Sequence, residues 1–216
     1  MQTITLNEKK YEIVSECEVW TIIKDEEGKT FALRKKRQRT HQEAIKILKR
    51  DGFPEEHIEI LQKLKQTTAI KHANTYLEKL YPSKWAYFQG TTGSGKTTAA
   101  VYITYKLLLQ GDINGAFYKA GYQKTETLQE KLQDFKESIL VVIDDLGMQP
   151  DFKQKDDISE ILFTAYDKKK SVIITSNYNW KDIAELYGDQ RLISRFRQKI
   201  VLFECGTKDL RTIKLA

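Results

Sequence analysis

The sequence predicts an α/β protein in which a parallel β-sheet lies between two layers of helices, preceded by a small β-meander and further helices. Three observations lead to this prediction. A glycine-rich loop at residues 90–97 joins an apolar run to a helical pattern. Beyond this loop, apolar runs alternate with helical patterns. Two of the runs, 139–143 and 172–174, are continuous and β-branched, as is typical of strands buried on both faces of a parallel sheet.

The chain before residue 82 divides into a β-rich part and a helical part. Residues 1–37 are rich in Val, Ile, Thr, Tyr, Trp and Phe between polar turns, so we expect a small antiparallel meander there. Its expected strands are 2–6, 11–14, 18–24 and 30–35. Residues 38–51 and 54–80 have helical patterns, and we expect a helical linker or adaptor over residues 38–81.

Residues 82–216 alternate strand and helix patterns, which predicts one three-layer core. The expected strands are 85–89, 115–119, 139–143, 171–175 and 198–203. The expected helices are 95–110, 125–136, 153–168, 180–187 and 189–196.

The glycine-rich loop matches the phosphate-binding pattern G-x-x-x-x-G-K-[ST] at every fixed position. Glycine lets successive backbone N–H groups point at phosphate oxygens, and the following helix presents its positive end to the same anion. Lys96 can reach the β- and γ-phosphates, and the Thr97 hydroxyl can ligate Mg²⁺. The sequence therefore predicts a nucleoside triphosphate site in a P-loop NTPase core. The expected nucleotide contacts are Gly90, Thr91, Thr92, Gly93, Ser94, Gly95, Lys96, Thr97 and Thr98.

Composition restricts the classes of protein to which the chain can belong. Of 216 residues, 40% are hydrophobic and 31% are charged, which is ordinary for a globular protein. No apolar run could cross a bilayer and the first ten residues have no signal-peptide core, so we expect a cytoplasmic location without membrane contact. The two cysteines and three histidines lack metal-ligand spacing. The net charge of +6 is spread along the chain and is compatible with a polyanionic partner.

Two acidic residues, Asp144 and Asp145, follow the expected strand at 139–143. Ligands bind at the carboxyl edge of a parallel sheet, so both carboxylates are expected beside the phosphate loop. Asp144 is the expected carboxylate on the Mg²⁺ side, and Asp145 is the candidate to orient and polarise the attacking water. The alternative for Asp145 is that it caps the next segment.

A polar triplet and a basic helix complete the set of candidate catalytic residues. Asn177 follows the strand at 171–175 and could bond the attacking water or the γ-phosphate, although Thr-Ser-Asn is by itself a common helix cap. Arg191 and Arg195 lie one helical turn apart, which by itself also describes an ordinary basic helix face. An arginine brought to the γ-phosphate would neutralise charge in the transition state. The candidate catalytic residues are Lys96, Asp145, Asn177 and Arg195.

Together, the phosphate loop, Asp-Asp-Leu-Gly at 144–147, Thr-Ser-Asn at 175–177 and Arg-Leu-Ile-Ser-Arg at 191–195 closely resemble one clade of AAA+ ATPases. These are the helicase loaders and transposition helpers, DnaC/DnaI-like and IstB-like. The resemblance covers about residues 82–211.

This resemblance implies ATP and Mg²⁺ as ligands and assigns roles by position. Asn177 resembles the sensor-1 residue, and Arg195 resembles an arginine finger offered to a neighbouring subunit. Asp145 stands where many AAA+ proteins have Glu, and its shorter side chain implies weak basal hydrolysis. We expect no C-terminal helical lid of the kind that many AAA+ proteins have, although Arg211 could partly substitute for a lid arginine.

The first function hypothesis is a helicase loader that binds a replicative helicase and single-stranded DNA and assembles through Arg195. The basic run at residues 34–39 could add phosphate contacts, or it could be a solvated strand end and helix start. The second is an IstB-like transposition helper ATPase that acts on duplex DNA with a transposase. A third class is a small-molecule kinase or GTPase using the same loop, but the guanine-reading motif Asn-Lys-x-Asp does not occur, and a kinase would leave the triplet at 175–177 and Arg195 unexplained. A fourth class would bind ATP without hydrolysing it.

Overall fold

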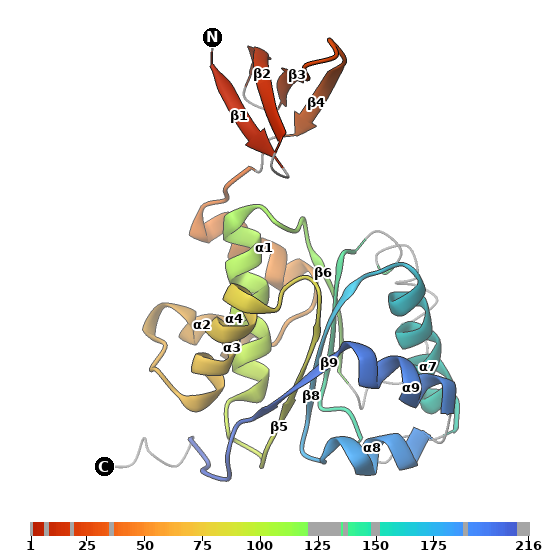
Figure 1. Cartoon of the computed structure of the whole chain (residues 1–216). Helices are drawn as coiled ribbons and strands as arrows, with labels where there is room; N and C mark the ends of the chain where they lie inside the picture. Colours follow the sequence, from red (N-terminus) through yellow and green to blue (C-terminus); the bar gives the residue numbers. More distant parts are fainter. Residues whose placement is uncertain are drawn as a thin grey trace.

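The computed structural model contains a five-stranded parallel sheet and a separate four-stranded antiparallel sheet (Figure 1). The structure describes residues 2–6, 9–17, 20–34, 37–120, 135, 138–147, 152–187 and 190–210. The parallel strands are β5 (Trp85–Gln89), β6 (Ala116–Ala120), β7 (Leu140–Asp144), β8 (Ser171–Ser176) and β9 (Ile200–Glu204). They lie in the order β6-β7-β8-β5-β9, and every neighbouring pair is parallel. The predicted parallel sheet is thus confirmed.

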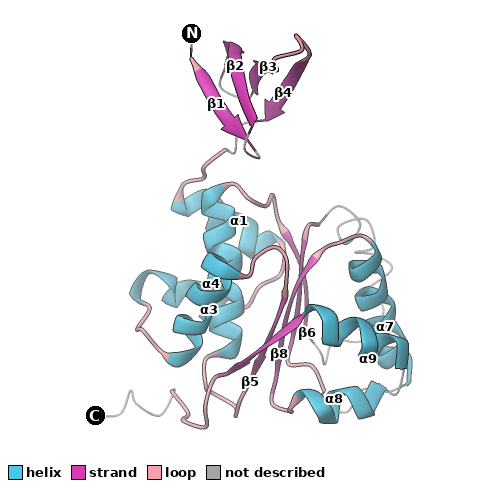
Figure 2. Cartoon of the chain, viewed as in Figure 1, coloured by secondary structure: helices cyan, strands magenta, loops and turns pink. Residues whose placement is uncertain are grey.

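Helices cover both faces of this sheet, which gives the predicted three layers (Figure 2). Of the described helices, one layer contains α1 (His41–Arg50), α2 (Glu55–Glu59), η1 (Ile60–Lys63), α3 (Thr68–Lys79) and α4 (Lys96–Gln110), and the other contains α7 (Phe152–Asp167), α8 (Trp180–Tyr187) and α9 (Gln190–Lys199). Successive strand residues point to opposite faces. In β5, Ala86 and Phe88 therefore join the core cluster under α4, while Trp85 and Tyr87 join the cluster under α7.

The central helix α4 starts and ends at glycines. Gly95 is its N-cap at φ 91°, and Gly111 is its C-cap at φ 73°. The Gly111 N–H bonds the carbonyl oxygens of Leu107 and Leu108, an ending that needs a left-handed residue. Between these caps α4 buries most of its side chains against the sheet and the helices α1 to α3. Its first turn is thereby held directly behind the phosphate loop.

The helical stretch predicted over residues 54–80 is interrupted. The structure has α2, then η1, then residues 64–67 without helix, and then α3. Thr67 explains the interruption, because its hydroxyl accepts a hydrogen bond from the Ile70 N–H and so starts a new helix. Buried residues of α1, α2 and α3 belong to the same hydrophobic cluster as α4.

The N-terminal strands form the predicted antiparallel meander. They are β1 (Thr3–Leu6), β2 (Lys9–Glu16), β3 (Trp20–Lys24) and β4 (Thr30–Arg34), paired in chain order. Ile23 pairs with Ile13 and with Phe31, so these three side chains share one face, and Ile23 is buried there. Among the described residues, neither large core cluster has a member before Ala44.

Most predicted elements lie within two residues of the observed bounds in the parallel sheet and its helices. The helix expected at 125–136 lies outside the described residues except for Phe135. In the described part of the chain, none of the helices has the length and apolarity that a bilayer crossing requires.

Candidate functional site

Three neighbouring strands bring the predicted site residues to one edge of the sheet. The phosphate loop follows β5, Asp145 follows β7 and Asn177 follows β8, and β8 lies between the other two strands. In a parallel sheet these carboxyl ends share one edge. The sheet order therefore gathers residues that are up to 87 positions apart in the sequence.

Lys96 is almost completely buried, with 6% of its surface exposed. Its Nζ donates to the carbonyl oxygens of Gly90 at 2.9 Å and Thr91 at 2.8 Å, and to Asn177 Oδ1 at 2.8 Å. A lysine ammonium has three donors, and these three contacts engage all of them. The cation is thus held at the phosphate loop and linked to the tip of β8.

Asp144 is buried and receives hydrogen bonds from three hydroxyl groups. Thr97 Oγ1 lies 2.9 Å from Oδ1 and 3.2 Å from Oδ2, Thr175 Oγ1 lies 2.5 Å from Oδ1, and the Tyr118 hydroxyl lies 3.0 Å from Oδ2. Carboxylate and hydroxyl oxygens are the ligands that Mg²⁺ prefers, and the loop beside them suits phosphates. The residues present therefore fit a Mg²⁺–nucleotide complex.

Asp145 has a left-handed backbone conformation, with φ 58°. Such conformations are costly for residues other than glycine and cluster at functional sites. Three contacts hold this one: the Asp145 N–H donates to Thr175 Oγ1 at 2.9 Å, the Leu146 N–H donates to the Thr175 carbonyl oxygen at 2.8 Å, and Asn177 Nδ2 donates to Asp145 Oδ1 at 3.1 Å. Burial and then the charge of Asp144 raise the pKa of Asp145, while Lys96 lowers it.

The remaining residues of the loop have different surroundings. The Ser94 hydroxyl is buried and has no hydrogen-bond partner among the described residues. Thr91 and Thr92 are exposed, whereas Thr98 is buried and its hydroxyl lies 2.9 Å from His57 Nδ1. An unpartnered hydroxyl inside a phosphate loop is a further sign that the loop accommodates a ligand.

A C-terminal segment, residues 206–210, lies against the phosphate loop. The Thr91 N–H donates to the Gly206 carbonyl oxygen at 3.2 Å, and the Leu210 N–H donates to the Gly93 carbonyl oxygen at 3.0 Å. Gly93 has φ 79°, and a Cβ there would lie 2.0 Å from Asp209 Oδ1. Glycine adopts this left-handed conformation without steric cost, and the Asp209 carboxylate occupies the space that a side chain at position 93 would need.

Arg195 lies away from this edge, on α9. Its guanidinium stacks over the rings of Phe163 and Tyr166, each centroid 5.0 Å away, and its Nη1 lies 3.5 Å from Asp167 Oδ1. These three partners all belong to α7 of the same chain. The structure thus brings Lys96, Asp144, Asp145 and Asn177 together but places Arg195 elsewhere. The side chain of Arg191 lies outside the described residues.

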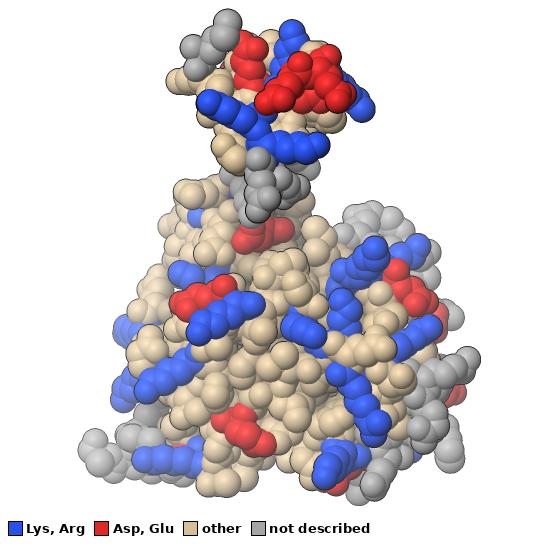
Figure 3. All heavy atoms as spheres, in the orientation of Figure 1, with Lys and Arg blue, Asp and Glu red and all other residues tan. Residues whose placement is uncertain are grey.

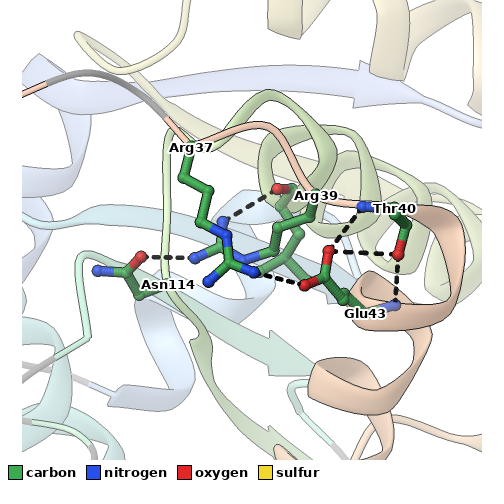
Figure 4. A network of polar contacts seen from close by, with 6 residues as sticks. Arg37, Arg39, Thr40, Glu43 and Asn114 are labelled. Atoms are coloured by element: carbon green, nitrogen blue, oxygen red, sulfur yellow. Dashed lines mark hydrogen bonds and ion pairs between the residues drawn. The ribbon is translucent and has the colours of Figure 1, made fainter. Parts of the chain in front are cut away.

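Charged side chains are interspersed over the face shown in Figure 3, with Lys and Arg lying among Asp and Glu. Part of the basic run at 34–39 supports the fold. Arg39 donates to the carbonyl oxygens of Leu108 at 3.1 Å and Ile113 at 2.9 Å and to Asn114 Oδ1 at 2.6 Å, across the end of α4 (Figure 4). Arg37 pairs with Glu43 at 2.7 Å. The side chains at 34–36 lie outside the described residues.

Sequence reasoning missed the contacts that Tyr118 and Thr175 make with Asp144. Thr175 belongs to the polar triplet at 175–177, so its position at the end of an expected strand was a usable signal. Tyr118 is a hydroxyl-bearing residue in the middle of β6, and its contact follows from β6 lying next to β7, a neighbour relation that no local pattern gives.

The three-layer fold and the loop define the class of protein: a P-loop nucleotide-binding protein. A family model for IstB-like ATP binding proteins matches residues 84–206, more than half of the chain. The chain belongs to this family. None of the curated proteins matches the sequence.

Solved structures share the fold. The structure of the DnaC helicase loader is similar with a TM-score of 0.56 and 21% identity, over 70% of this chain and 99% of that chain. The structure of DnaI has a TM-score of 0.51 and 22% identity, over 71% of this chain and 94% of that chain. AMPPCP-bound DnaA from Aquifex aeolicus has a TM-score of 0.51 and 19% identity, over 67% of this chain and 49% of that chain.

Proposed function

We propose that this chain is an ATPase of DNA replication that binds a replicative helicase and loads it onto single-stranded DNA. The observation that carries the proposal is the continuous set of contacts from Lys96 through Asn177 to Asp145, beside the pair of Thr97 and Asp144. A phosphate-binding cation and a carboxylate suited to orient water are thereby joined by one amide side chain. This is the arrangement that hydrolysis of a bound triphosphate needs.

Each residue of the site has a distinct proposed role. Lys96 exchanges its carbonyl partners for β- and γ-phosphate oxygens when nucleotide enters. Asp145 orients the attacking water and accepts its proton, and the raised pKa of Asp145 suits a base. Asn177 bonds both groups and so fixes the position of the Asp145 carboxylate relative to the Lys96 ammonium. Thr97 and Asp144 would hold Mg²⁺, which when bound neutralises charge on the phosphates.

Hydrolysis by this mechanism is proposed to need a second copy of the chain. Arg195 contacts α7 of its own subunit and would reach a γ-phosphate only across a subunit interface. An arginine supplied in this way typically accelerates hydrolysis by ~10³–10⁵-fold. Self-association through Arg195, with weak activity of the isolated subunit, follows from the proposal.

The division of labour along the chain is also part of the proposal. Residues 82–216 would form the ATPase core, residues 38–81 an adaptor that packs on it, and residues 1–37 a module that holds the helicase. The sheet in this last segment has exposed apolar side chains, Val14 and Phe31, and it shares no large core cluster with the rest of the described chain.

The second candidate function is that of a transposition helper that acts on duplex DNA with a transposase. The family match favours it, because the matching model is named for IstB-like proteins. The nucleotide site would be the same in both cases. The two candidates differ in the form of DNA and in the protein partner.

Phosphate release by the full chain tests the proposal. We expect Mg²⁺-dependent phosphate release from ATP that is slow for the protein alone, is stimulated by single-stranded DNA, and is stimulated further by a replicative helicase from the same cell. Salt is held constant, since contacts to DNA phosphates weaken steeply as it rises. Duplex DNA of the same length and sequence is the matched comparison.

The control is Lys96→Ala, which removes the loop cation and should abolish release under every condition. Stimulation by duplex DNA alone would favour the transposition helper. Absence of release with either DNA and with the helicase, despite ATP binding, would contradict both candidates and indicate a protein that binds ATP without hydrolysing it.

A further inference from the structure

We propose that Tyr118 is a positioning residue that holds Asp144 in the orientation needed on the metal side of the nucleotide site. The inference deepens the proposed function and rests on it, since it assumes that the Thr97–Asp144 pair receives Mg²⁺. Tyr118 belongs to β6, the edge strand beside β7, and its hydroxyl donates to Asp144 Oδ2 at 3.0 Å. It matches no part of the motifs for which sequence reasoning singled out site residues.

The ring of Tyr118 is fixed before its hydroxyl meets the carboxylate. Only 6% of the side chain is exposed, and it lies in the core cluster under α4. The ring packs against Phe53 with centroids 4.6 Å apart. A hydroxyl on a ring that packing holds in place is a pre-organised donor.

The two oxygens of Asp144 are held by donors on different elements. Thr175 of β8 donates to Oδ1 at 2.5 Å, and Tyr118 of β6 donates to Oδ2 at 3.0 Å. Thr97 of α4 lies within hydrogen-bond distance of both oxygens. Because β6 and β8 flank β7, one donor comes from each side, and rotation of the carboxylate would break at least one bond.

Other buried tyrosines of this chain use their hydroxyls differently. Tyr76 donates to the carbonyl oxygen of Lys84, and Tyr87 donates to the carbonyl oxygen of Tyr178, each at 2.9 Å. Those bonds satisfy a buried hydroxyl and fix the fold. Tyr118 instead donates to the carboxylate that contacts Thr97, so its bond can affect a ligand.

Residues that orient a metal-side carboxylate from behind change metal affinity when they are lost. Such substitutions typically weaken metal binding by ~10–100-fold. Tyr118→Phe keeps the ring that packs on Phe53 and deletes only the donor. We therefore expect a weaker response to Mg²⁺ with an unchanged phosphate loop.

The test is equilibrium binding of a fluorescent ATP analogue to the full chain, first in EDTA and then with Mg²⁺ titrated in. For Tyr118→Phe we expect the same nucleotide affinity as wild type in EDTA. The Mg²⁺ concentration that gives half of the metal-dependent gain in nucleotide affinity should be about tenfold higher than for wild type. Binding of Mn²⁺ in the presence of the nucleotide, followed by electron paramagnetic resonance, should weaken by a similar factor. Thermal unfolding of each variant shows whether its fold is retained.

Tyr76→Phe is the matched control, since Tyr76 lies in the same core cluster but donates to a backbone carbonyl. It should leave both the affinity in EDTA and the Mg²⁺ response unchanged. A Tyr118→Phe variant with the wild-type Mg²⁺ and Mn²⁺ responses would overturn the inference, as would an equal loss of affinity with and without metal. A wild-type protein whose nucleotide binding ignores Mg²⁺ would instead refute the proposed function.

Discussion

The edge of the parallel sheet and the outer helix α9 present their candidate catalytic groups in different ways. At the sheet edge, Lys96 contacts Asn177, and Asn177 contacts Asp145, all within one chain. On α9, Arg195 stacks on Phe163 and Tyr166 and has no such link to the loop among its described contacts. The first set is assembled by folding alone. Under the proposed function the second acts across a subunit interface, so experiments that vary subunit concentration can separate the two.

The largest expected effect comes from Arg195→Ala. If Arg195 acts across an interface, the substitution should lower hydrolysis in the assembled protein by ~10³-fold or more while ATP affinity stays unchanged. Turnover and nucleotide binding would be measured over a range of protein concentrations that spans assembly. The deficit should appear only where the wild-type rate per subunit rises with concentration.

Arg197→Ala is the control, because Arg197 lies on the same helix and is exposed. It should leave turnover unchanged. If Arg195→Ala lowers ATP affinity, or if the loss of turnover is equal at all protein concentrations, then Arg195 acts within its own subunit and does not differ in this respect from the residues at the sheet edge.

Lys96→Ala, which also abolishes turnover, is expected to have a smaller effect on nucleotide affinity than Arg195→Ala has on hydrolysis, and to leave assembly unchanged. Loss of charge-assisted bonds to two phosphates should weaken nucleotide binding by about 100-fold, at every protein concentration. Calorimetric titration with a non-hydrolysable ATP analogue measures this. Lys106→Ala, on the same helix, is the control and should bind normally. Unchanged binding by Lys96→Ala would show that the loop does not hold the phosphates.

The smallest of the three effects is expected for Arg39, a basic residue that we expect to take part neither in hydrolysis nor in nucleotide binding. Arg39→Ala removes three hydrogen bonds across the end of α4 and should lower the free energy of unfolding by about 1–3 kcal/mol in urea. Its DNA affinity at native conditions should match that of the wild type.

Arg37→Ala breaks an exposed pair with Glu43 and should cost at most about 0.5 kcal/mol. A loss of DNA affinity in Arg39→Ala without loss of stability would contradict the structural role and would indicate that the basic run at 34–39 contacts DNA.

Residues at the ends of buried strands could be predicted because their position follows from chain order. Asp144 and Asn177 follow continuous apolar runs, and parallel strands place such positions at one edge. The same logic could not reach Tyr118, whose contact depends on which strands are neighbours in space. Nor could it show the end of η1 before Thr67, where a single capping hydroxyl interrupts a continuous apolar pattern.

The basic run and Arg195 show a second limit of the sequence. Arginine is used for caps, stacking, ion pairs and phosphate contacts alike, and its residue type does not distinguish them. Arg39 bonds the end of α4, while Arg195 stacks on aromatic rings. Only the contacts of each side chain separate these uses.

The segment 206–210 lies far from the phosphate loop in sequence but contacts it in the structure, so nucleotide binding and the position of this segment can affect each other. Asp209 brings a negative charge to Gly93, where a polyphosphate would add more, and like charges at that range repel. We expect nucleotide entry to loosen this segment. A partner that draws residues 206–210 away from the loop would therefore tighten ATP binding. Because such coupling is reciprocal, ATP would strengthen the binding of that partner by the same free energy.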